Sequence, residues 1–410
     1  MSTDMSLPKE AIKKYERDGF LSLMKSGGSR VAQKLSYPIA NSWYQRSRKI
    51  SRSELLTGQS SENVIQLDSR KEAAHEYDIP FGLSKSDPGF RYMPRYKFRD
   101  QYVVKLQDIR LLGPDALPMT KERDLISEAI ETPEEDGYRL KQTLNRTVSD
   151  YSAKKSYLSG STEEYDCVCS LTTSWSNYYH WMVEHLPKLR AIEAATNEWD
   201  IQPELLIPAN PPSYITESLE LMGYSPDDCI QWDSGLIETS NYIQPTFTEP
   251  TKQVCNWIQK RALDNMPKDL PEFNSNRVYV SREKTTQRNI VNRKEVEVLL
   301  SDFGFEKYTT EDLSVPEQVA LFSNADTILG AHGAGLTDMI WSNNLSVVEL
   351  FNNVVKPPYF QMSQELGLDY YPIQGTSIGD SGYNSDMKIN TDELETVLQK
   401  VTSNKRNNSD

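Results

Sequence analysis

Two segments of this chain hold three of its four histidines, in settings where their side chains could do chemistry. The first runs from Asn177 to Lys188 as NYYHWMVEHLPK and contains His180 and Glu184. These two residues are four apart, so a helix would place them on one face, where they could work as an acid–base pair. The alternative is an ordinary solvated polar face, shared with Asn177 and Lys188. The segment is also rich in aromatic residues, which many sites use to hold a sugar ring: Trp175, Tyr178, Tyr179 and Trp181.

A metal site is a second interpretation of the same segment, with His180, Glu184 and His185 as ligands of a metallohydrolase. The two histidines are five residues apart, about 140° around a helix. Zinc-binding histidine pairs on a helix are one turn apart. The spacing therefore disfavours a metal, and we expect none.

The second segment, Asp326 to Leu336, reads DTILGAHGAGL and contains His332. A short apolar strand ends there in a glycine-rich turn that opens a helix. Small residues let a ligand approach the backbone, and a helix N-terminus presents free N–H groups to phosphate. The segment lacks the GxGxxG fingerprint and the lysine of a P-loop. The carboxyl end of a parallel strand is nevertheless where open α/β sheets bind ligands.

Charged residues follow two further predicted strands. Arg282 ends the strand VYVSR and Arg288 lies in the next loop, so both could make bidentate contacts to a diphosphate. Surface charge is the alternative for both. Glu349 lies in the strand VVELF, where its carboxylate could hold ribose hydroxyls or face solvent.

The elements that must position these residues alternate between strand and helix, which predicts a parallel sheet covered on both faces. In the second half we expect strands at 277–281, 327–329, 347–350 and 369–372. Helices are expected at 293–303, 316–322, 359–366 and 391–401, with another opening at 333–334. Asn292 and Glu295 have the spacing of a capping box. In the first half we expect strands at 102–111, 165–171, 204–207 and 236–243, helices at 214–222 and 253–266, irregular structure at 53–98, and a hinge at 244–250.

Size and composition limit the possible functions. The chain has 410 residues, enough for two α/β domains, and a net charge of −14, which disfavours a nucleic-acid partner. The four cysteines form no metal spacing or disulfide framework, and neither a signal peptide nor a run of roughly 18–20 apolar residues is present. We therefore expect a cytoplasmic protein. Residues 1–52 carry a net charge of +7 with interleaved apolar residues, which suits either an anionic membrane surface or a solvated tail.

The motifs taken together resemble glycosyltransferase family 61. The similarity rests on the NYYHWMVEHLPKL helix, the SR…R…N..E stretch, the GAHGAGLT loop and the VVELF strand, and it covers roughly residues 100–375. Arg293 departs from the family pattern, which places an acid there, and Glu295 could substitute for it. The resemblance implies an α/β protein of the GT-B type, with two Rossmann-like domains facing across a cleft. It also implies inverting transfer of a hexosyl or pentosyl group from a nucleotide sugar without an essential metal or other cofactor, and the chain has no Asp-x-Asp motif.

The residues and the resemblance together assign roles and partners. The basic arm and linker over residues 1–98 has no counterpart in the family, 99–250 would be the acceptor-side domain, 251–401 the donor domain, and 402–410, at the chain end, a disordered tail. His180 and Glu184 would be catalytic, and Asn177, Tyr178 and Trp181 would contact the acceptor. The donor, most simply a UDP-sugar, would contact Arg282, Arg288, His332, Gly333, Ala334, Gly335 and Glu349. The acceptor would be a glycan or lipid-linked glycan used in polysaccharide biosynthesis, with membrane contact through residues 1–52. A catalytically inactive nucleotide- or sugar-binding protein of the same fold is the alternative.

Overall fold

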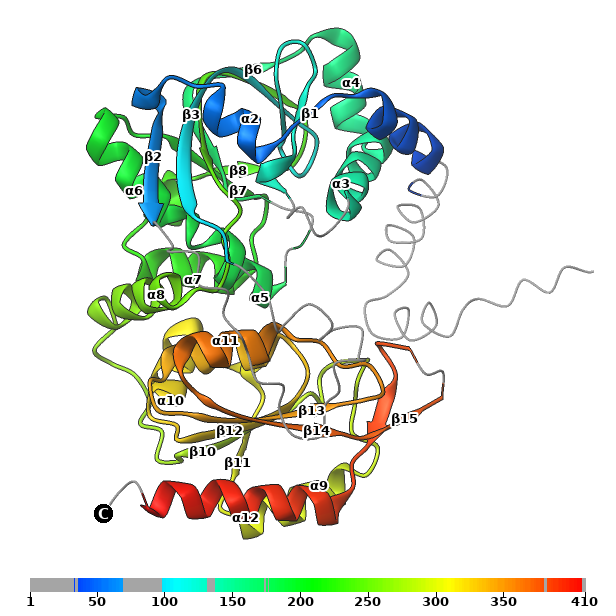
Figure 1. Ribbon diagram of the computed structural model, residues 1–410, viewed down its shortest axis with the longest axis vertical. Coiled ribbons are helices and arrows are strands. Elements are labelled where there is room, and N and C mark those ends of the chain that lie inside the picture. Colours follow the sequence, from blue (N-terminus) through cyan, green and yellow to red (C-terminus); the bar gives the residue numbers. More distant parts are fainter. Residues whose placement is uncertain are drawn as a thin grey trace, which may run out of the picture.

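The chain folds around two β-sheets with helices packed between and outside them in the computed structural model (Figure 1). The structure describes residues 33, 36–68, 98–130, 137–172, 175, 177–379 and 382–407. The predicted α/β class is confirmed. Within the described residues, no helix is both long and apolar enough to cross a membrane.

The sheet of the first half is mixed, with the order β1-β5-β4-β3-β9-β6-β7-β8 and β2 paired to β3. Strands β9, β6, β7 and β8 run parallel to one another, whereas β3 is antiparallel to β9, β4 and β2. Its strands are β1 (Lys49–Ile50), β2 (Val64–Asp68), β3 (Gln101–Leu112), β4 (Leu117–Met119), β5 (Leu125–Ile126), β6 (Glu163–Ser170), β7 (Glu204–Pro208), β8 (Ile230–Trp232) and β9 (Leu236–Pro245). The helices of this half are α2 (Arg52–Thr57), α3 (Tyr138–Ser149), α4 (Tyr151–Ser159), α5 (Tyr178–His180), α6 (Lys188–Trp199), α7 (Ser213–Leu221) and α8 (Lys252–Asp264).

The sheet of the second half is parallel throughout, as predicted, with the order β11-β10-β12-β13-β14. Its strands are β10 (Arg277–Val280), β11 (Glu306–Tyr308), β12 (Thr327–Ala331), β13 (Ser346–Phe351) and β14 (Asp369–Gln374). Helices α10 (Val315–Ser323) and α11 (Pro358–Leu366) cover one face, and α9 (Arg293–Asp302) and α12 (Thr391–Asn407) cover the other (Figure 1). A short hairpin, β15 (Thr376–Ile378) and β16 (Asp386–Lys388), was not predicted.

One hydrophobic cluster runs through both halves. It includes Trp181 and Leu219 from the first half and Val278, Val319 and Trp341 from the second. The two sheets therefore share a continuous core through the helices between them, because those helices bury apolar side chains on more than one side. The domain limits expected from the sequence stay a prediction.

Three local expectations are corrected. Residues 53–68, assigned to irregular structure, contain most of α2 and all of β2, and β2 pairs with β3. Helix α12 continues to Asn407, into the segment expected to be a disordered tail, whereas 408–410 lie outside the described residues. Asn292 does not cap α9 with its side chain. Its amide instead pairs with the backbone N–H and C=O of Ile389 and donates to Glu295, while Arg293 pairs with Glu283 on the surface.

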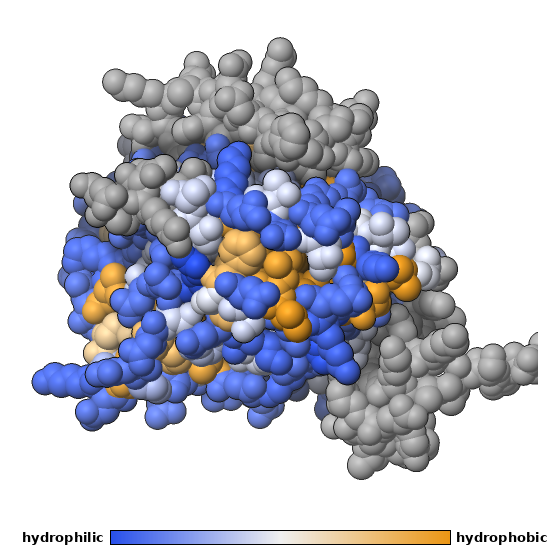
Figure 2. Space-filling view, turned by 90° about the horizontal axis from the view of Figure 1, so that it is seen from below, coloured by the Kyte–Doolittle hydropathy of each residue, from blue (hydrophilic) through white to orange (hydrophobic). Residues whose placement is uncertain are grey.

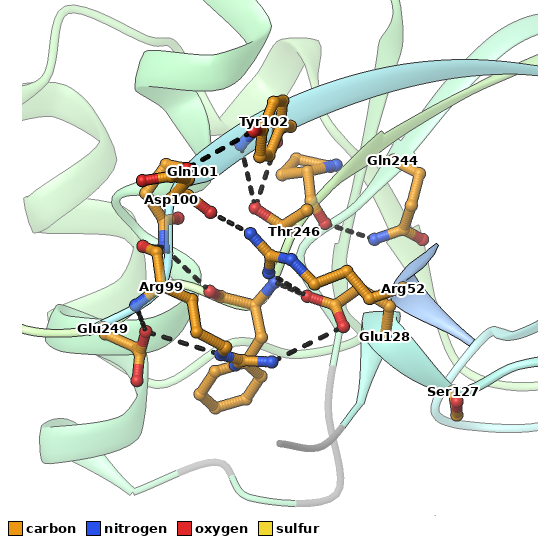
Figure 3. Close-up of polar contacts among 12 residues, drawn as sticks. Arg52, Arg99, Asp100, Gln101, Tyr102, Ser127, Glu128, Gln244, Thr246 and Glu249 are labelled. Carbon is orange, nitrogen blue, oxygen red and sulfur yellow. Dashed lines mark hydrogen bonds and ion pairs between the residues drawn. The ribbon is translucent and has the colours of Figure 1, made fainter. Parts of the chain in front are cut away.

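Residues 244–250, expected to be a hinge, are a buried and tightly connected segment (Figure 3). Glu128 accepts a hydrogen bond from the Phe247 N–H, and the Gln101 side chain donates to the Phe247 carbonyl. Glu249 accepts from the Arg99 N–H. Arg99 in turn lies 3.6 Å from both Glu128 and Glu249, and Arg52 lies 2.7 Å from Glu128. These contacts fix the segment against the first sheet.

The second part of the basic arm, from residue 36 onward, is folded. Residues 36–46 form a helix that buries Ala40, and Arg48 and Arg52 form ion pairs with Asp124 and Glu128. The solvated-tail interpretation is therefore wrong for residues 36–52. Residues 1–32 lie outside the described residues, so the arm as a whole stays a prediction.

All four cysteines are free thiols.

Candidate functional site

The second sheet has a topological switch point between β10 and β12. The chain leaves β10 for β11 on one side, and later strands are added on the other side, beginning with β12. At such a point the loops after two adjacent strands diverge and leave a crevice at the carboxyl ends. Arg282 follows β10 and His332 follows β12. The fold therefore brings together two of the predicted donor residues.

The glycine-rich turn is shaped by this proximity. A Cβ atom on Gly333 would lie 1.8 Å from Nη1 of Arg282, so the guanidinium packs directly on the glycine backbone. Cβ atoms on Gly330 and Gly335 would approach Val280 of β10 at 3.1 Å and 2.8 Å. The glycines thus allow the turn to lie close against β10 and its arginine. Ala334 begins the 3-10 helix η8 (Ala334–Trp341) directly afterwards.

Arg282 and Arg288 are two cations held near each other, and no described carboxylate pairs with either of them. Neither forms an ion pair with a described residue, and the Nε atoms of both are buried without a hydrogen bond. Burial, and after it the charge of Arg288, lowers the pKa of Arg282 to about 10. Arg288 donates to the Tyr383 hydroxyl at 2.8 Å and lies over that ring. Such an arrangement is stabilised by an anion with several oxygens, as in a diphosphate.

His332 forms a buried pair with Glu349. Its Nδ1 lies 2.5 Å from Oε1 of Glu349, and Oε2 of the same carboxylate accepts a hydrogen bond from Tyr370. The carboxylate orients the imidazole and leaves Nε2 as the ring atom that can meet a ligand. Glu349 itself is fully buried. Its expected contact with ribose is therefore a wrong prediction, because both of its oxygens are used by side chains of the chain.

Aromatic rings enclose His332. Its ring stacks on Phe351 and meets Tyr359 and Tyr383 edge to face, with centroid distances of 5.4–5.8 Å. The ammonium group of Lys356 lies over the ring of Tyr383. The strand ends thus combine cations with flat aromatic surfaces, which suit phosphate and a base or sugar ring respectively.

The helix around His180 contains an irregular turn. After α5, residues Trp181–His185 form a π-helical turn, η5, in which the Leu186 N–H bonds to the Trp181 carbonyl. Turns of this kind are frequent at functional sites. His180 Nδ1 lies 2.8 Å from Oε1 of Glu184, as the four-residue spacing predicted.

Glu184 is held as an anion. Arg139 from α3 donates to both of its oxygens, at 2.7 Å and 3.1 Å. Burial alone would raise the pKa of Glu184, but the contacts with His180 and Arg139 outweigh it and lower the pKa to about 2. Arg139 is itself packed between the rings of Trp175 and Phe247. The solvated-face interpretation is therefore wrong, because Glu184 is buried.

His185 and Lys188 belong to a different environment. The π-turn changes the angular position of later residues, so Lys188 does not share the face of His180. It donates instead to the Ser170 carbonyl. His185 packs on Trp181, and burial keeps its pKa well below the usual range. Together with Lys188 it lines a cavity of about 20 Å³, separate from the His180–Glu184 contact. No cluster of three or more potential metal ligands occurs within the described residues.

The residues expected to contact the acceptor are occupied within the protein. Trp181 is only 1% exposed and its indole donates to Ser218, so this prediction is wrong. Asn177 caps α5 by accepting from the His180 N–H. The Tyr178 hydroxyl donates to Asp338 of η8 at 2.7 Å. These side chains shape the site by holding the helix.

Two tyrosines join the two groups of candidate residues. Tyr179, which contacts the His180 ring, meets Tyr359 edge to face at 5.6 Å, and Tyr359 contacts His332. His180 and His332 therefore lie on two sides of one aromatic pair, although 152 positions separate them in the sequence. Sequence reasoning missed Arg139, Tyr359 and Tyr383, because nothing in their local pattern shows that they reach this site.

Strand-end cations, a glycine-rich turn and a facing histidine–carboxylate pair are groups suited to a phosphorylated ligand and to proton transfer beside it. The family model described as Glycosyltransferase 61 matches residues 178–348. That segment begins one residue after Asn177 and ends one residue before Glu349. The chain thus carries a glycosyltransferase family 61 domain and is a glycosyltransferase, as its motifs predicted. Among curated proteins, none matches this sequence.

Proposed function

We propose that the chain is an inverting, metal-independent glycosyltransferase of the GT-B type that uses a UDP-sugar and extends a glycan or lipid-linked glycan. The observation that carries this proposal is the placement of Arg282 and His332 at adjacent strand ends, opposite His180 and Glu184. The site residues come from both halves of the chain, as a GT-B enzyme requires.

The donor diphosphate would bind to Arg282 and Arg288, with His332 Nε2 and the backbone of residues 333–335 completing the contacts. Both arginines lack a carboxylate partner in the described part of the chain and lie close to each other. A leaving nucleoside diphosphate gains negative charge as the glycosidic bond breaks. Fixed cations stabilise that charge without rearrangement, which is the task a metal performs in other transferases.

His180 would act as the base. A carboxylate with its pKa near 2 holds a proton poorly at neutral pH, so Glu184 is suited to orient the imidazole rather than to accept the proton. With Nδ1 facing Glu184, His180 Nε2 would take the proton of the acceptor hydroxyl. The hydroxyl oxygen then bonds to the anomeric carbon as the bond to the diphosphate breaks, and the configuration inverts.

Isothermal titration with UDP tests the donor site. Arg282→Ala and His332→Ala should each weaken binding by about 10- to 100-fold, the ~1.5–3 kcal/mol of a charge-assisted hydrogen bond. Unchanged affinity in both variants would place the donor elsewhere. If UDP binds but the purified protein neither transfers sugar nor hydrolyses the donor, the inactive binding protein is the correct alternative.

A further inference from the structure

A groove of about 600 Å³ lies on the first half of the chain, away from the candidate site. The helix over residues 36–46, together with α3 and α4, forms its walls, and these three helices lie together in Figure 1. Its lining is mainly apolar and includes Ile39, Trp43, Val148, Tyr157 and Leu158.

The three helices that form the groove carry exposed apolar side chains. Ten large hydrophobic residues are exposed within the described part of the chain, and five of them come from these three helices. Leu158 is 83% exposed and Ile39 is 62% exposed. Both also line the groove. Large apolar side chains gathered on one surface indicate a contact with another apolar phase or partner.

The rim of the groove carries positive charge. Arg46, Arg123 and Lys154 line it and are exposed, and none of them forms an ion pair with a described residue. Asp124 at the rim is neutralised by Arg48, which leaves Glu122 as the one acid of the lining that forms no ion pair within the described part of the chain. This local excess of cations contrasts with the net charge of −14 for the whole chain. The complementary partner is therefore anionic as well as apolar.

From these observations we infer that this groove docks the protein on the surface of an anionic phospholipid bilayer. Leu158 and Ile39 enter the acyl region, Trp43 lies at the level of the headgroups, and Arg46, Arg123 and Lys154 meet lipid phosphates. Helix α3 links this surface to the candidate site, since Arg139 contacts Glu184 and Val148 lines the groove. At 1.5 Å per residue these two positions are roughly 13 Å apart along the helix, so docking brings the site close to the membrane surface.

Co-sedimentation of the full-length protein with vesicles tests the inference. Vesicles of phosphatidylcholine with phosphatidylglycerol should pellet the protein, and vesicles of phosphatidylcholine alone should pellet it much less. Ile39→Glu combined with Leu158→Glu should lower the partition coefficient at least tenfold, equivalent to about 1.4 kcal/mol. Lys154→Glu should weaken only the component of vesicle binding that depends on phosphatidylglycerol. Because these side chains are exposed, the variants should keep the wild-type unfolding temperature and UDP affinity.

Val298→Glu is the matched control. Val298 is 65% exposed and belongs to α9, which lies at the opposite end of the molecule from α3 and α4 (Figure 1). Figure 2 views the molecule from that end and shows hydrophobic residues grouped among hydrophilic ones. This variant should pellet like the wild type. Loss of binding in Val298→Glu alone would move the docking surface to that end. If every variant pellets equally, the groove is not the docking surface, and binding is assigned to residues 1–32. If the wild type is a dimer that the Ile39→Glu, Leu158→Glu variant dissociates, the groove instead binds a second copy of the chain.

Discussion

Replacing Gly333 with alanine should separate the role of the glycine-rich turn from the stability of the fold. The added Cβ would lie 1.8 Å from Arg282 Nη1, whereas Cβ contacts closer than 3.0 Å essentially never occur. The backbone of Gly333 has φ 172°, which any residue adopts, so the substitution adds no strain of its own. The guanidinium is the flexible end of a long side chain and will move instead.

The Gly333→Ala substitution should weaken UDP binding rather than destabilise the fold. A displacement that takes Nη1 out to at least 3.0 Å from the new Cβ removes it from the position it holds against the turn. A charge-assisted hydrogen bond to a diphosphate operates at about 2.7–2.9 Å and is worth ~1.5–3 kcal/mol. Gly333→Ala should therefore weaken UDP binding by about 10- to 100-fold, the loss also expected for Arg282→Ala, with little change in unfolding temperature.

Titration calorimetry and thermal unfolding of the same preparations measure both quantities. Gly382→Ala is the matched control, because a Cβ there meets no atom within 4 Å. In an Arg282→Ala background, Gly333→Ala should cost no further affinity, since the side chain it displaces is already absent. Wild-type affinity in Gly333→Ala, or fully additive losses in the double variant, would refute the proposed coupling of glycine and arginine.

Three further predictions concern catalysis and pH. His180→Ala and Glu184→Gln should each lower kcat by about 10²–10⁴ while UDP affinity stays near wild type, and wild-type turnover in both would exclude this helix from catalysis. Activity should survive excess EDTA; complete loss that Mn²⁺ or Mg²⁺ restores would contradict the metal-free mechanism. Burial raises the pKa of Asp338 from 3.8 to about 7, so the folded state keeps a proton that the unfolded chain releases between these values. Stability should therefore fall as pH rises from about 4 to 7, by on the order of 4 kcal/mol at most, and denaturant unfolding of Asp338→Asn should show that this slope is lost.

The sequence was sufficient for the local elements of the second half and for several residues of the site. Apolar strands followed by polar or glycine-rich turns are encoded by neighbouring residues, so Arg282 and His332 were found at strand ends. The four-residue spacing likewise placed His180 beside Glu184. The first half was less predictable. Its sheet is mixed, and short strands such as β2 depend on a distant partner rather than on their own pattern.

What each polar side chain contacts was decided by the tertiary structure. The sequence left Glu349 as either a ribose ligand or a solvated acid, yet β14 brings Tyr370 and β12 brings His332 to its two oxygens. Trp181 is of a residue type that often holds a sugar ring, but it is buried in the core and its indole donates to Ser218. Arg139 reaches Glu184 from 45 positions away.

By itself, therefore, the sequence determined the α/β class, the strand ends that carry the cations and the family, because these depend on local periodicity and short motifs. Only the tertiary structure decided which acids orient histidines and which arginines are left for a ligand. Those outcomes depend on burial and on long-range pairing, and a buried charge is stable only where the fold supplies its partner.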